Sequence, residues 1–568
     1  MGKTFQGLPA SSGIAIGPIW KYIPQTINIS RHLVADRQIE WKRFEDSRSR
    51  AEEELDVLYH RALEMTGDEE AAIFEAHKML LNDPELASAI HKTIMDEGMN
   101  AEAAVHDSVE NYAAMLLAMD NEYFRERATD IRDVGNRLIR CLQGIDCEAG
   151  EQPQQPVIIL AEDLTPSDTI QFEKDMILGF CTIKGGPTSH TAILSKSLGK
   201  PAIVSLQADF DEIEQDLTAI LDGSKGEFIL APSEKVLQKA KESQEVISLI
   251  KDDQLKRAHQ PAITTDGTQL EIVANIGSAE DARQAIDSGA EGVGLLRTEF
   301  LYLDRDSMPS EEEQIQTYRE IFEIMSGKPI VIRTLDIGGD KEVSFLGTQH
   351  EPNPFLGWRA IRMIDERPEI LSDQFRAILQ ADPNADLRIM LPLVSCIDEI
   401  IKARGIYDQS VAELKQENKA FTQKVQFGIM VEVPSAAILA EELAEIVDFF
   451  SIGTNDLTQY SLAVDRTNER VAHLASPFNP AVIRLISMTI QAAHKKGKWV
   501  GLCGEMAGDP LATKLLLGLG LDEFSMSAPC IPEIKHLIRQ CSFSECQEIA
   551  QKALKCASTD QILDLLNQ

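Results

Sequence analysis

The residues with the clearest chemical potential lie around a histidine that follows a glycine-rich turn. Gly185–Thr191 reads Gly-Gly-Pro-Thr-Ser-His-Thr, and an apolar segment follows it. Two glycines let the backbone approach an anion closely, and Thr188 and Ser189 are residue types that cap a helix start, where free N–H groups favour a phosphate. His190 then falls in the first turn of the expected helix, where a neutral imidazole can attack phosphorus. An ordinary turn with a surface histidine would give the same pattern. Residues in the second half of the chain distinguish between these two interpretations.

The second half of the chain contains arginines suited to binding phosphate and carboxylate oxygens. They are Arg297, Arg333, Arg359 and Arg466. The guanidinium group is a fixed fork that can bind two oxygens at once. Any one of these arginines could belong to a structural ion pair instead, but several of them near strand ends together favour an anion site.

Carboxylates and a cysteine accompany these arginines. Glu432 and Asp456 are hard oxygen ligands that suit Mg²⁺ when a substrate supplies the remaining oxygens, and the metal would support enolate-type charge. The alternative is that both carboxylates pair with the arginines. Asn455 adjoins Asp456, and Cys503 is either a buried apolar thiol or a group that moves a proton.

A regular alternation of strands and helices from about residue 262 positions these side chains. The candidate strands are Leu270–Asn275, Gly292–Leu296, Ile330–Arg333, Arg388–Leu393, Gly428–Val433, Phe449–Gly453, Trp499–Cys503 and Asp522–Met526. Eight such strands predict a (β/α)₈ TIM barrel, whose chemistry lies at the C-terminal ends of the strands. The polar residues named above cluster at these ends, and buried charges are costly unless they are paired or functional.

The first half of the chain predicts a smaller α/β domain interrupted by a helical bundle. Residues 1–30 and 145–230 form the α/β domain, with His190 on a loop-to-helix turn, and residues 31–144 form the bundle. The bundle carries many acidic residues, which form either a solvated face or a docking surface for a basic partner. Residues 231–260 predict a helical linker, and residues 261–568 form the barrel. The fold class is therefore α/β multidomain.

Composition limits the classes of function. A chain of 568 residues should hold about three domains, and the net charge of −36 argues against nucleic-acid binding. No uncharged apolar run reaches the roughly 18–20 residues of a membrane span, and no secretory signal is expected at the N-terminus. Nine cysteines without a metal or disulfide spacing suggest reduced thiols. We therefore expect a cytoplasmic protein.

With these residues assembled, the chain resembles the enzyme I family of the bacterial phosphoenolpyruvate:sugar phosphotransferase system. The resemblance runs nearly from end to end and is carried by several motifs: Gly185–Thr191, Leu295–Phe300, Arg333–Lys341, Asn353–Ala360, Ser451–Arg466 and Asp522–Ser527. The histidine motif alone also resembles pyruvate phosphate dikinase and phosphoenolpyruvate synthase. The combination is specific to enzyme I.

The resemblance implies a reaction and a role for each residue. Phosphoenolpyruvate and Mg²⁺ bind in the barrel, His190 takes the phosphoryl group, and a histidine of the small carrier protein HPr, docked on the bundle, receives it. Arg297, Arg333, Arg359 and Arg466 hold the phosphate and carboxylate with help from Asn455, while Glu432 and Asp456 bind Mg²⁺ and Cys503 protonates the enolate. The family implies a homodimer through the barrel.

The chain departs from the family pattern beside His190. The family often has an aspartate and an arginine around the two glycines, whereas this chain has Ile183 and Lys184 before them and Pro187 after them. A charge pair near His190 is therefore expected to be missing, with Lys184 replacing part of the positive charge. This change bears on the tuning of His190 or on the carrier preference, and it leaves the Thr-Ser-His-Thr core intact.

Three alternatives remain. An ATP-dependent dikinase or synthase would need a nucleotide-binding domain, for which we find no glycine-rich ATP loop. The nitrogen-regulatory relative of enzyme I usually carries an extra N-terminal sensory domain, which we do not expect here. A non-catalytic docking protein would have lost His190 or the barrel arginines, and this chain keeps both.

Overall fold

The computed structural model describes the chain as two compact units, Met1–Leu249 and Ile250–Gln568. The described residues are 2–24, 27–66, 68–118, 122–145, 153–186, 189–303, 305, 307–338, 343–346, 351, 353–466 and 468–568. Pro187 and Thr188 of the histidine motif, and residues 339–341 of the Arg333 motif, lie outside them. Each unit is described by itself.

The first unit contains an eight-stranded sheet in the order β1-β8-β7-β3-β4-β5-β6-β2. Its strands are β1 (Lys3–Gln6), β2 (Leu8–Ser11), β3 (Ile14–Tyr22), β4 (Val157–Ala161), β5 (Ile177–Thr182), β6 (Ala202–Val204), β7 (Thr218–Asp222) and β8 (Glu227–Leu230). The strands β3 to β6 are parallel. The helices α6 (Pro166–Ile170) and α7 (His190–Ser197) connect β4 to β5 and β5 to β6, so α7 starts at the histidine.

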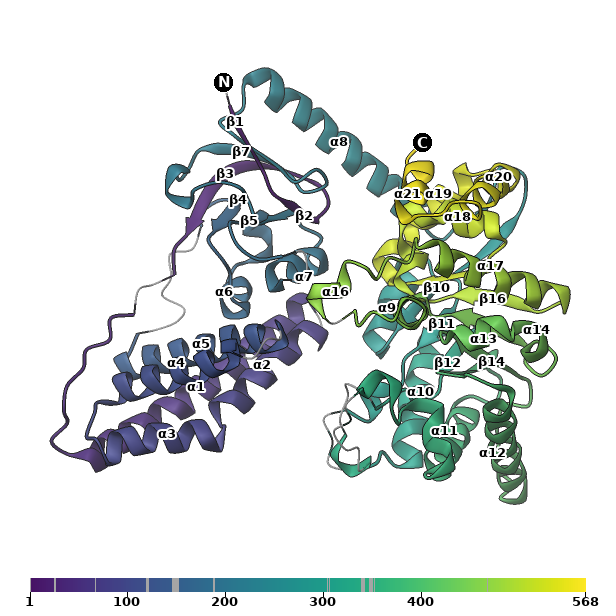
Figure 1. Ribbon diagram of the computed structural model, residues 1–568, viewed down its shortest axis with the longest axis horizontal. Coiled ribbons are helices and arrows are strands. Elements are labelled where there is room, and N and C mark those ends of the chain that lie inside the picture. The colour runs from purple at the N-terminus through teal and green to yellow at the C-terminus, as the bar shows by residue number, and fades with distance from the viewer. Residues whose placement is uncertain are drawn as a thin grey trace. The chain divides into compact units, whose positions relative to one another are not determined.

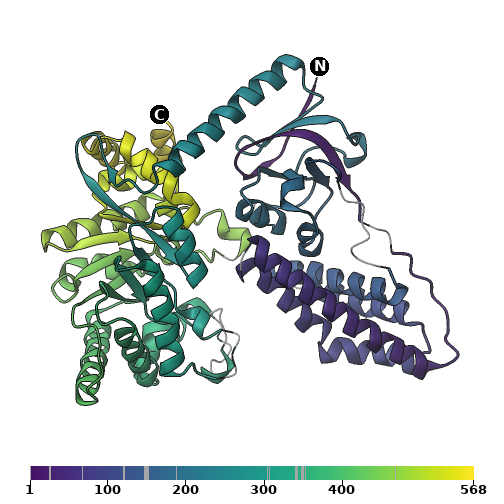
Figure 2. The ribbon, with the colours of Figure 1, turned by 180° about the vertical axis from the view of Figure 1, so that it is seen from behind.

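Five helices form a bundle in the same unit (Figures 1 and 2). They are α1 (Arg37–Thr66), α2 (Asp68–Leu81), α3 (Pro84–Met95), α4 (Ala101–Ala118) and α5 (Glu122–Gln143). The chain breaks between α2 and α3 because Asp83 accepts hydrogen bonds from the N–H groups of Glu85 and Leu86 and Pro84 is the first residue of α3. Bundle side chains such as Phe44 share one hydrophobic core with Val157 of β4.

One long helix, α8 (Glu234–Lys256), spans the boundary between the two units, in agreement with the predicted helix of the linker. Gln244 Nε2 donates a 2.9 Å hydrogen bond to the carbonyl of Ile14 in the first unit. In the second unit, Lys535 Nζ donates a 3.0 Å bond to the carbonyl of Ala258, just beyond the end of α8. Residues 245–252, between these two anchors, are all exposed.

The second unit is a closed barrel of eight parallel strands, as the sequence predicts. The order is β11-β12-β13-β14-β15-β16-β17-β10, and β10 pairs with β11 to close it. The strands are β10 (Gln269–Ile276), β11 (Val293–Leu296), β12 (Ile330–Arg333), β13 (Leu387–Leu391), β14 (Val425–Val431), β15 (Phe449–Ile452), β16 (Trp499–Leu502) and β17 (Glu523–Met526), with β9 (Ala262–Ile263) antiparallel to β10. Leu295, Val331, Met390, Met430 and Phe449 form a separate core.

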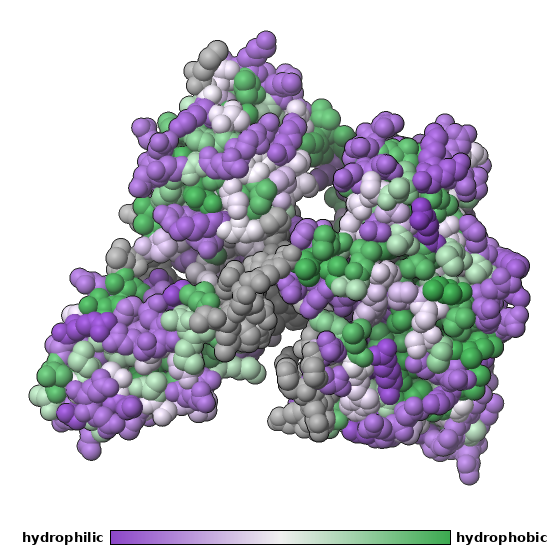
Figure 3. Space-filling view, viewed as in Figure 1, coloured by the Kyte–Doolittle hydropathy of each residue, from purple (hydrophilic) through white to green (hydrophobic). Residues whose placement is uncertain are grey.

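Helices accompany the barrel strands, and further short helices follow the last strand. They are α9 (Ala279–Asp287), α10 (Glu311–Met325), α11 (Pro368–Ala381), α12 (Ile397–Gln416), α13 (Pro434–Ile438), α14 (Ala440–Leu443), α15 (Thr454–Leu462), α16 (Glu469–Ala472), α17 (Pro480–Lys495), α18 (Pro510–Leu519), α19 (Ile531–Gln540), α20 (Phe543–Ala553) and α21 (Thr559–Leu566). Among the described residues, none of the helices has the length and apolar character needed to cross a membrane. Hydrophilic side chains cover much of the visible surface (Figure 3).

Candidate functional site

The residues at the C-terminal ends of the barrel strands line one cavity. It is open to solvent, and the space between its walls, including the part continuous with solvent, is about 900 Å³. All eight barrel residues that the sequence analysis selected line it: Arg297, Arg333, Arg359, Glu432, Asn455, Asp456, Arg466 and Cys503. Arg333 is the last residue of β12, and Asn455 and Asp456 lie in the first turn of α15 after β15. The barrel therefore brings together side chains that are up to about 200 positions apart.

Arg333 is held in the wall of the cavity by two carboxylates. Its Nη2 lies 2.9 Å from Glu299 Oε1 and its Nη1 lies 3.0 Å from Asp336 Oδ2. Burial alone would lower the pKa of Arg333, but the charges of Glu299 and Asp336 raise it above its usual value. The guanidinium is therefore charged and fixed in direction.

Arg359 is fixed by the same aspartate. Its Nη2 donates to both carboxylate oxygens of Asp336, at 2.9 and 3.0 Å, and its Nη1 donates to the Tyr460 hydroxyl at 3.4 Å. Asp456 Oδ2 lies 3.7 Å from the same guanidinium. Against the effect of burial, these groups, Asp336 foremost, raise the pKa of Arg359. Asp336 thus orients two of the four selected arginines.

The other two arginines are exposed at the cavity. Arg466 Nη2 lies 3.4 Å from Asp456 Oδ1, and the backbone N–H of Arg466 donates to Gln459 Oε1 at 3.0 Å. Arg297 is exposed and forms no ion pair with another described residue. Two oriented and two more accessible guanidinium groups can bind an anion with more than one charged end.

Glu432 and Asp456 provide a donor set that fits a divalent cation together with substrate oxygens. Glu432 is 2% exposed and accepts a 2.6 Å hydrogen bond from the N–H of Leu393. Burial first, and then the carboxylates of Asp336 and Asp456, raise its pKa, whereas the charge of Arg333 opposes the shift. Asp456 Oδ1 is buried, lies 3.4 Å from Arg466 Nη2 and accepts no hydrogen bond from any described residue. No cluster of three or more metal-binding side chains occurs within the described ranges, so an ion here would take its remaining ligands from substrate and water, as Mg²⁺ commonly does.

Cys503 is a buried thiol directly after β16. Its side chain is 5% exposed, and Sγ lies 3.8 Å from the carbonyl oxygen of Ile452. Burial raises the pKa of the thiol to about 11, so it is protonated at neutral pH and can donate a proton. Asn275 Nδ2 donates to the carbonyl of Cys503 at 3.0 Å and fixes the backbone there.

Asn455 is held by a reciprocal pair of hydrogen bonds. Its Nδ2 donates to Glu505 Oε1 at 2.9 Å, and its Oδ1 accepts from the N–H of Glu505 at 3.1 Å. The pair joins the first turn of α15 to the segment after β16.

His190 is the first residue of α7 in the first unit. Its Nε2 is buried and forms no hydrogen bond with any described residue. Ser189 occupies the N-cap position, as expected, but its side chain makes no capping hydrogen bond. Gly185 has a φ of +88°, which favours glycine, and its carbonyl accepts a 2.5 Å hydrogen bond from Ser205 Oγ. The imidazole thus lies at a helix start where the Ser189 and Thr191 hydroxyls also lack hydrogen-bond partners among the described residues.

A charge pair lies close to this turn despite the changed residues before it. Lys184 Nζ is 2.6 Å from Glu162 Oε2, and both side chains are exposed. Burial raises the pKa of the neighbouring Asp163, whereas the charges of Lys184 and His190 oppose that shift. The positive charge of Lys184 therefore lies beside the turn and is paired with Glu162.

Sequence reasoning gave no role to three residues that hold the arginines. Glu299 accepts hydrogen bonds from Arg333 and from the N–H of Asp336, and Tyr460 contacts Arg359. Glu299 and Asp336 lie two and three positions after Arg297 and Arg333. Acidic residues so close to selected arginines were the available signal.

The fold and this geometry define a two-unit protein with an anion-binding (β/α)₈ barrel and a histidine at a helix start in an α/β unit. Three family models match the chain: "PEP-utilising enzyme, N-terminal" over residues 6–127, "PEP-utilising enzyme, mobile domain" over 153–226 and "PEP-utilising enzyme, PEP-binding domain" over 251–543.

Curated relatives match over the whole length. A phosphoenolpyruvate-protein phosphotransferase of Staphylococcus carnosus (strain TM300) is 43% identical over 100% of this chain and 99% of that protein. One of Bacillus subtilis (strain 168) is 42% identical over 100% of this chain and 99% of that protein. The chain belongs to the phosphoenolpyruvate-protein phosphotransferase family of PEP-utilising enzymes.

Proposed function

We propose that this chain transfers the phosphoryl group of phosphoenolpyruvate to His190 and then to a histidine of the carrier protein HPr, releasing pyruvate. This is the first step of the sugar phosphotransferase system. The observation that carries the proposal is the full-length match to phosphoenolpyruvate-protein phosphotransferases. The convergence of four arginines, four carboxylates and a thiol on one cavity supports it.

The proposed roles of the barrel residues follow from their chemistry. Arg297, Arg333, Arg359 and Arg466 bind the phosphate and carboxylate of the substrate through charge-assisted hydrogen bonds, and Asn455 adds a neutral donor. Glu432 and Asp456 hold Mg²⁺, which supplies Lewis-acid stabilisation of oxygen charge when it is bound.

The proposed chemical step breaks one bond to phosphorus and forms another. The imidazole of His190 attacks phosphorus, a phosphorus–nitrogen bond forms, and the bond from phosphorus to the enol oxygen breaks. The leaving enolate takes a proton from the Cys503 thiol at its methylene carbon and becomes pyruvate, and solvent returns a proton to the sulfur. In the second step, the phosphoryl group passes from His190 to the carrier histidine.

The proposed division into domains assigns one task to each part. Residues 1–30 and 145–230 form the phosphohistidine domain, residues 31–144 the HPr-docking bundle, residues 231–260 the linker and residues 261–568 the phosphoenolpyruvate-binding barrel. The family-model boundaries support the separation of a mobile domain from a PEP-binding domain.

The proposed partners fit exposed surfaces of each part. On the bundle, Met79 of α2 is 72% exposed and Met115 of α4 is 63% exposed, while Glu75 and Glu85 are exposed acidic residues, a combination that suits a basic carrier protein. On the barrel, Ile438 of α13 is 62% exposed, and such apolar helix surface supports the proposed homodimer.

We place the protein in the cytoplasm.

Pyruvate release coupled to carrier phosphorylation tests the proposed function. Purified protein with phosphoenolpyruvate, Mg²⁺ and HPr should form pyruvate and phospho-HPr in equal amounts, and omission of Mg²⁺ should stop both. Pyruvate formation that needs ATP or AMP, or that leaves HPr unmodified, would contradict the proposal.

A further inference from the structure

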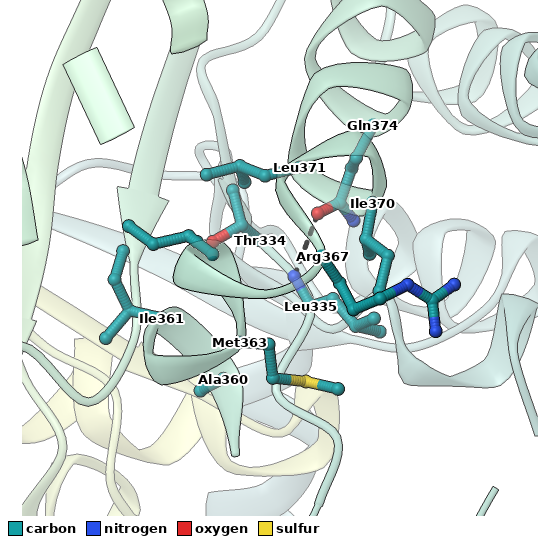
Figure 4. Close-up of a pocket in the computed structure, with 10 residues that line it drawn as sticks. Thr334, Leu335, Ala360, Ile361, Met363, Arg367, Ile370, Leu371 and Gln374 are labelled. Atoms are coloured by element: carbon teal, nitrogen blue, oxygen red, sulfur yellow. Dashed lines mark hydrogen bonds between the residues drawn. The ribbon is translucent and has the colours of Figure 1, made fainter. Parts of the chain in front are cut away.

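A fully buried glutamine lies behind the arginine-bearing loops of the barrel. Gln374 of α11 is 0% exposed. Its Oε1 accepts a 2.9 Å hydrogen bond from the N–H of Leu335, and its Nε2 donates to Thr298 Oγ1 at 3.0 Å and to the Tyr318 hydroxyl at 3.3 Å. Figure 4 shows the Gln374 amide pointing from α11 toward the N–H of Leu335. The side chain lines no part of the substrate cavity.

The glutamine connects two strand ends that carry site residues. Thr298 follows Arg297 at the end of β11, and its hydroxyl donates a 3.0 Å hydrogen bond to the carbonyl of Arg333. The Gln374 amide and the Thr298 hydroxyl therefore hold the peptide groups on both sides of Thr334. Arg333 directly precedes the segment held by these bonds and Asp336 directly follows it. Asp336 in turn orients Arg359.

The loop is also packed from behind by buried side chains. A narrow pocket, with room for little more than one water molecule, is lined by Thr334, Leu335, Ala360, Met363 and Gln374 (Figure 4). Ala360 adjoins Arg359, so this space backs both oriented arginines. Packing excludes water from most of this region, so the hydrogen bonds of Gln374 set the direction of the loop, because a buried donor or acceptor left without its partner is costly.

We propose that Gln374 is a positioning residue for phosphoenolpyruvate: through Thr298 and Leu335 it sets the direction in which Arg333, Asp336 and hence Arg359 face the substrate. The inference rests on the proposed function of the cavity. Both halves of the amide are needed. The amide oxygen accepts a hydrogen bond from the N–H of Leu335, and the amide nitrogen donates one to the Thr298 hydroxyl.

Two replacements separate this role from simple packing. Gln374→Met keeps an unbranched side chain but removes both donor and acceptor. Gln374→Glu can reproduce the bonds only when its carboxyl is protonated, because an ionised carboxylate has no donor. The position is 0% exposed. Glu299 acts on the neighbouring Tyr318 and is paired with Arg333, and Arg367 lines the same pocket as Gln374. Burial favours the neutral form of a carboxyl and keeps it protonated to a higher pH than usual.

The matched control is Gln380→Met on the same helix. Gln380 Nε2 donates to Glu311 Oε1 at 2.7 Å and to the carbonyl of Arg376, and neither partner lines the cavity. This variant loses hydrogen bonds of α11 without disturbing the arginines that line the cavity. Thr298→Val and Thr298→Ser test the second half of the connection, because only serine keeps the hydroxyl.

The experiment measures KM for phosphoenolpyruvate, kcat and phosphoryl back-transfer from phospho-HPr to His190 in the full chain. For Gln374→Met and Thr298→Val we expect KM to rise about tenfold, the worth of one well-placed hydrogen bond, with a smaller change in kcat. Thr298→Ser and Gln380→Met should stay near the wild-type KM. Back-transfer, which does not use the barrel, should be unchanged. The KM of Gln374→Glu relative to wild type should fall toward one as the pH is lowered, whereas that of Gln374→Met should not.

The outcomes separate the two claims. A wild-type KM for folded Gln374→Met, or an equal rise for Gln380→Met, would overturn the positioning role while leaving the proposed function in place. If Gln374→Met does not fold, a wild-type KM for Thr298→Val together with a pH-independent ratio for Gln374→Glu would overturn it instead. Wild-type protein that accepts phosphoryl groups from phospho-HPr but not from phosphoenolpyruvate would contradict the proposed function of the cavity itself, and the inference with it.

Discussion

Among single residues, Asp336 does most to organise the barrel mouth. Its carboxylate lies 3.0 Å from Arg333 and 2.9 Å from Arg359, and Glu299 bonds both Arg333 and the N–H of Asp336. The two guanidinium groups therefore cannot turn freely when the cavity is empty. Such preorganisation lowers the entropic cost of binding a charged substrate.

Arg333→Ala should strongly impair use of phosphoenolpyruvate. The substrate loses charge-assisted hydrogen bonds, and Glu299 and Asp336 are left without their partner, so we expect kcat/KM to fall by about 10- to 100-fold or more. Arg333→Lys keeps the positive charge but not the forked guanidinium, so its kcat/KM should lie between those of the wild type and Arg333→Ala. Arg484→Ala is the control, because the exposed Arg484 donates to the backbone carbonyls of Leu554 and Cys556 and lies outside the cavity lining. Near-normal kinetics for Arg333→Ala would argue strongly against the assigned pocket.

Among the elements, α10 and α11 are joined by an ion-pair cluster that lies apart from the cavity. Glu311 of α10 accepts hydrogen bonds from Arg376, Gln380 and Lys419. Burial alone would raise its pKa, but these bonds outweigh burial and lower the pKa of Glu311 to about 2. The ionised form is therefore favoured in the folded state, which couples barrel stability to pH.

Glu311→Gln should destabilise the barrel at neutral pH. The Glu311 carboxylate has a lower pKa in the folded chain than the usual 4.5. Its contribution to the free energy of unfolding is therefore full above pH 4.5 and disappears as the pH falls toward 2. We expect a loss on the order of 1 kcal/mol at pH 7, as for a partly exposed ion-pair network. Denaturant unfolding at several pH values measures it. A wild-type minus variant difference that grows as the pH falls would contradict the assignment.

The elements were largely predictable from the sequence, and the connections between side chains were not. The predicted strand Ile330–Arg333 is β12 with the same limits, because a short apolar run bounded by turn and polar residues has few other solutions. The polar residues after such strands had to meet at one rim of a barrel. By contrast, the double pairing of Asp336 and the hydrogen bonds of Gln374 depend on side-chain placement between segments far apart in the chain, which no local pattern encodes.

For the whole molecule, the proposal requires His190 to serve two sites, because it must meet the barrel mouth and later a carrier on the bundle. The linker helix α8 is anchored at Gln244 in one unit and adjoins the Lys535–Ala258 bond in the other. We propose that the exposed residues 245–252 bend when the unit that carries His190 moves. Linker segments act in this way in domain motions on the microsecond to millisecond scale.

A cleavable cross-link that holds the histidine-bearing unit away from the barrel should separate the two transfers. Phosphorylation by phosphoenolpyruvate should be lost, because His190 no longer reaches the cavity, while back-transfer from phospho-HPr should remain. Cleaving the cross-link should restore the forward reaction and serves as the control. Unchanged forward transfer in the cross-linked chain would refute the hinge.

The most direct measurement of the central claim is the site of a phosphoryl label. Incubation with labelled phosphoenolpyruvate and Mg²⁺ should place an acid-labile label on His190, and addition of HPr should remove it to the carrier. The His190→Ala variant should take up none. A label mapped to another residue, or full exchange of phosphoryl groups by His190→Ala, would contradict the account.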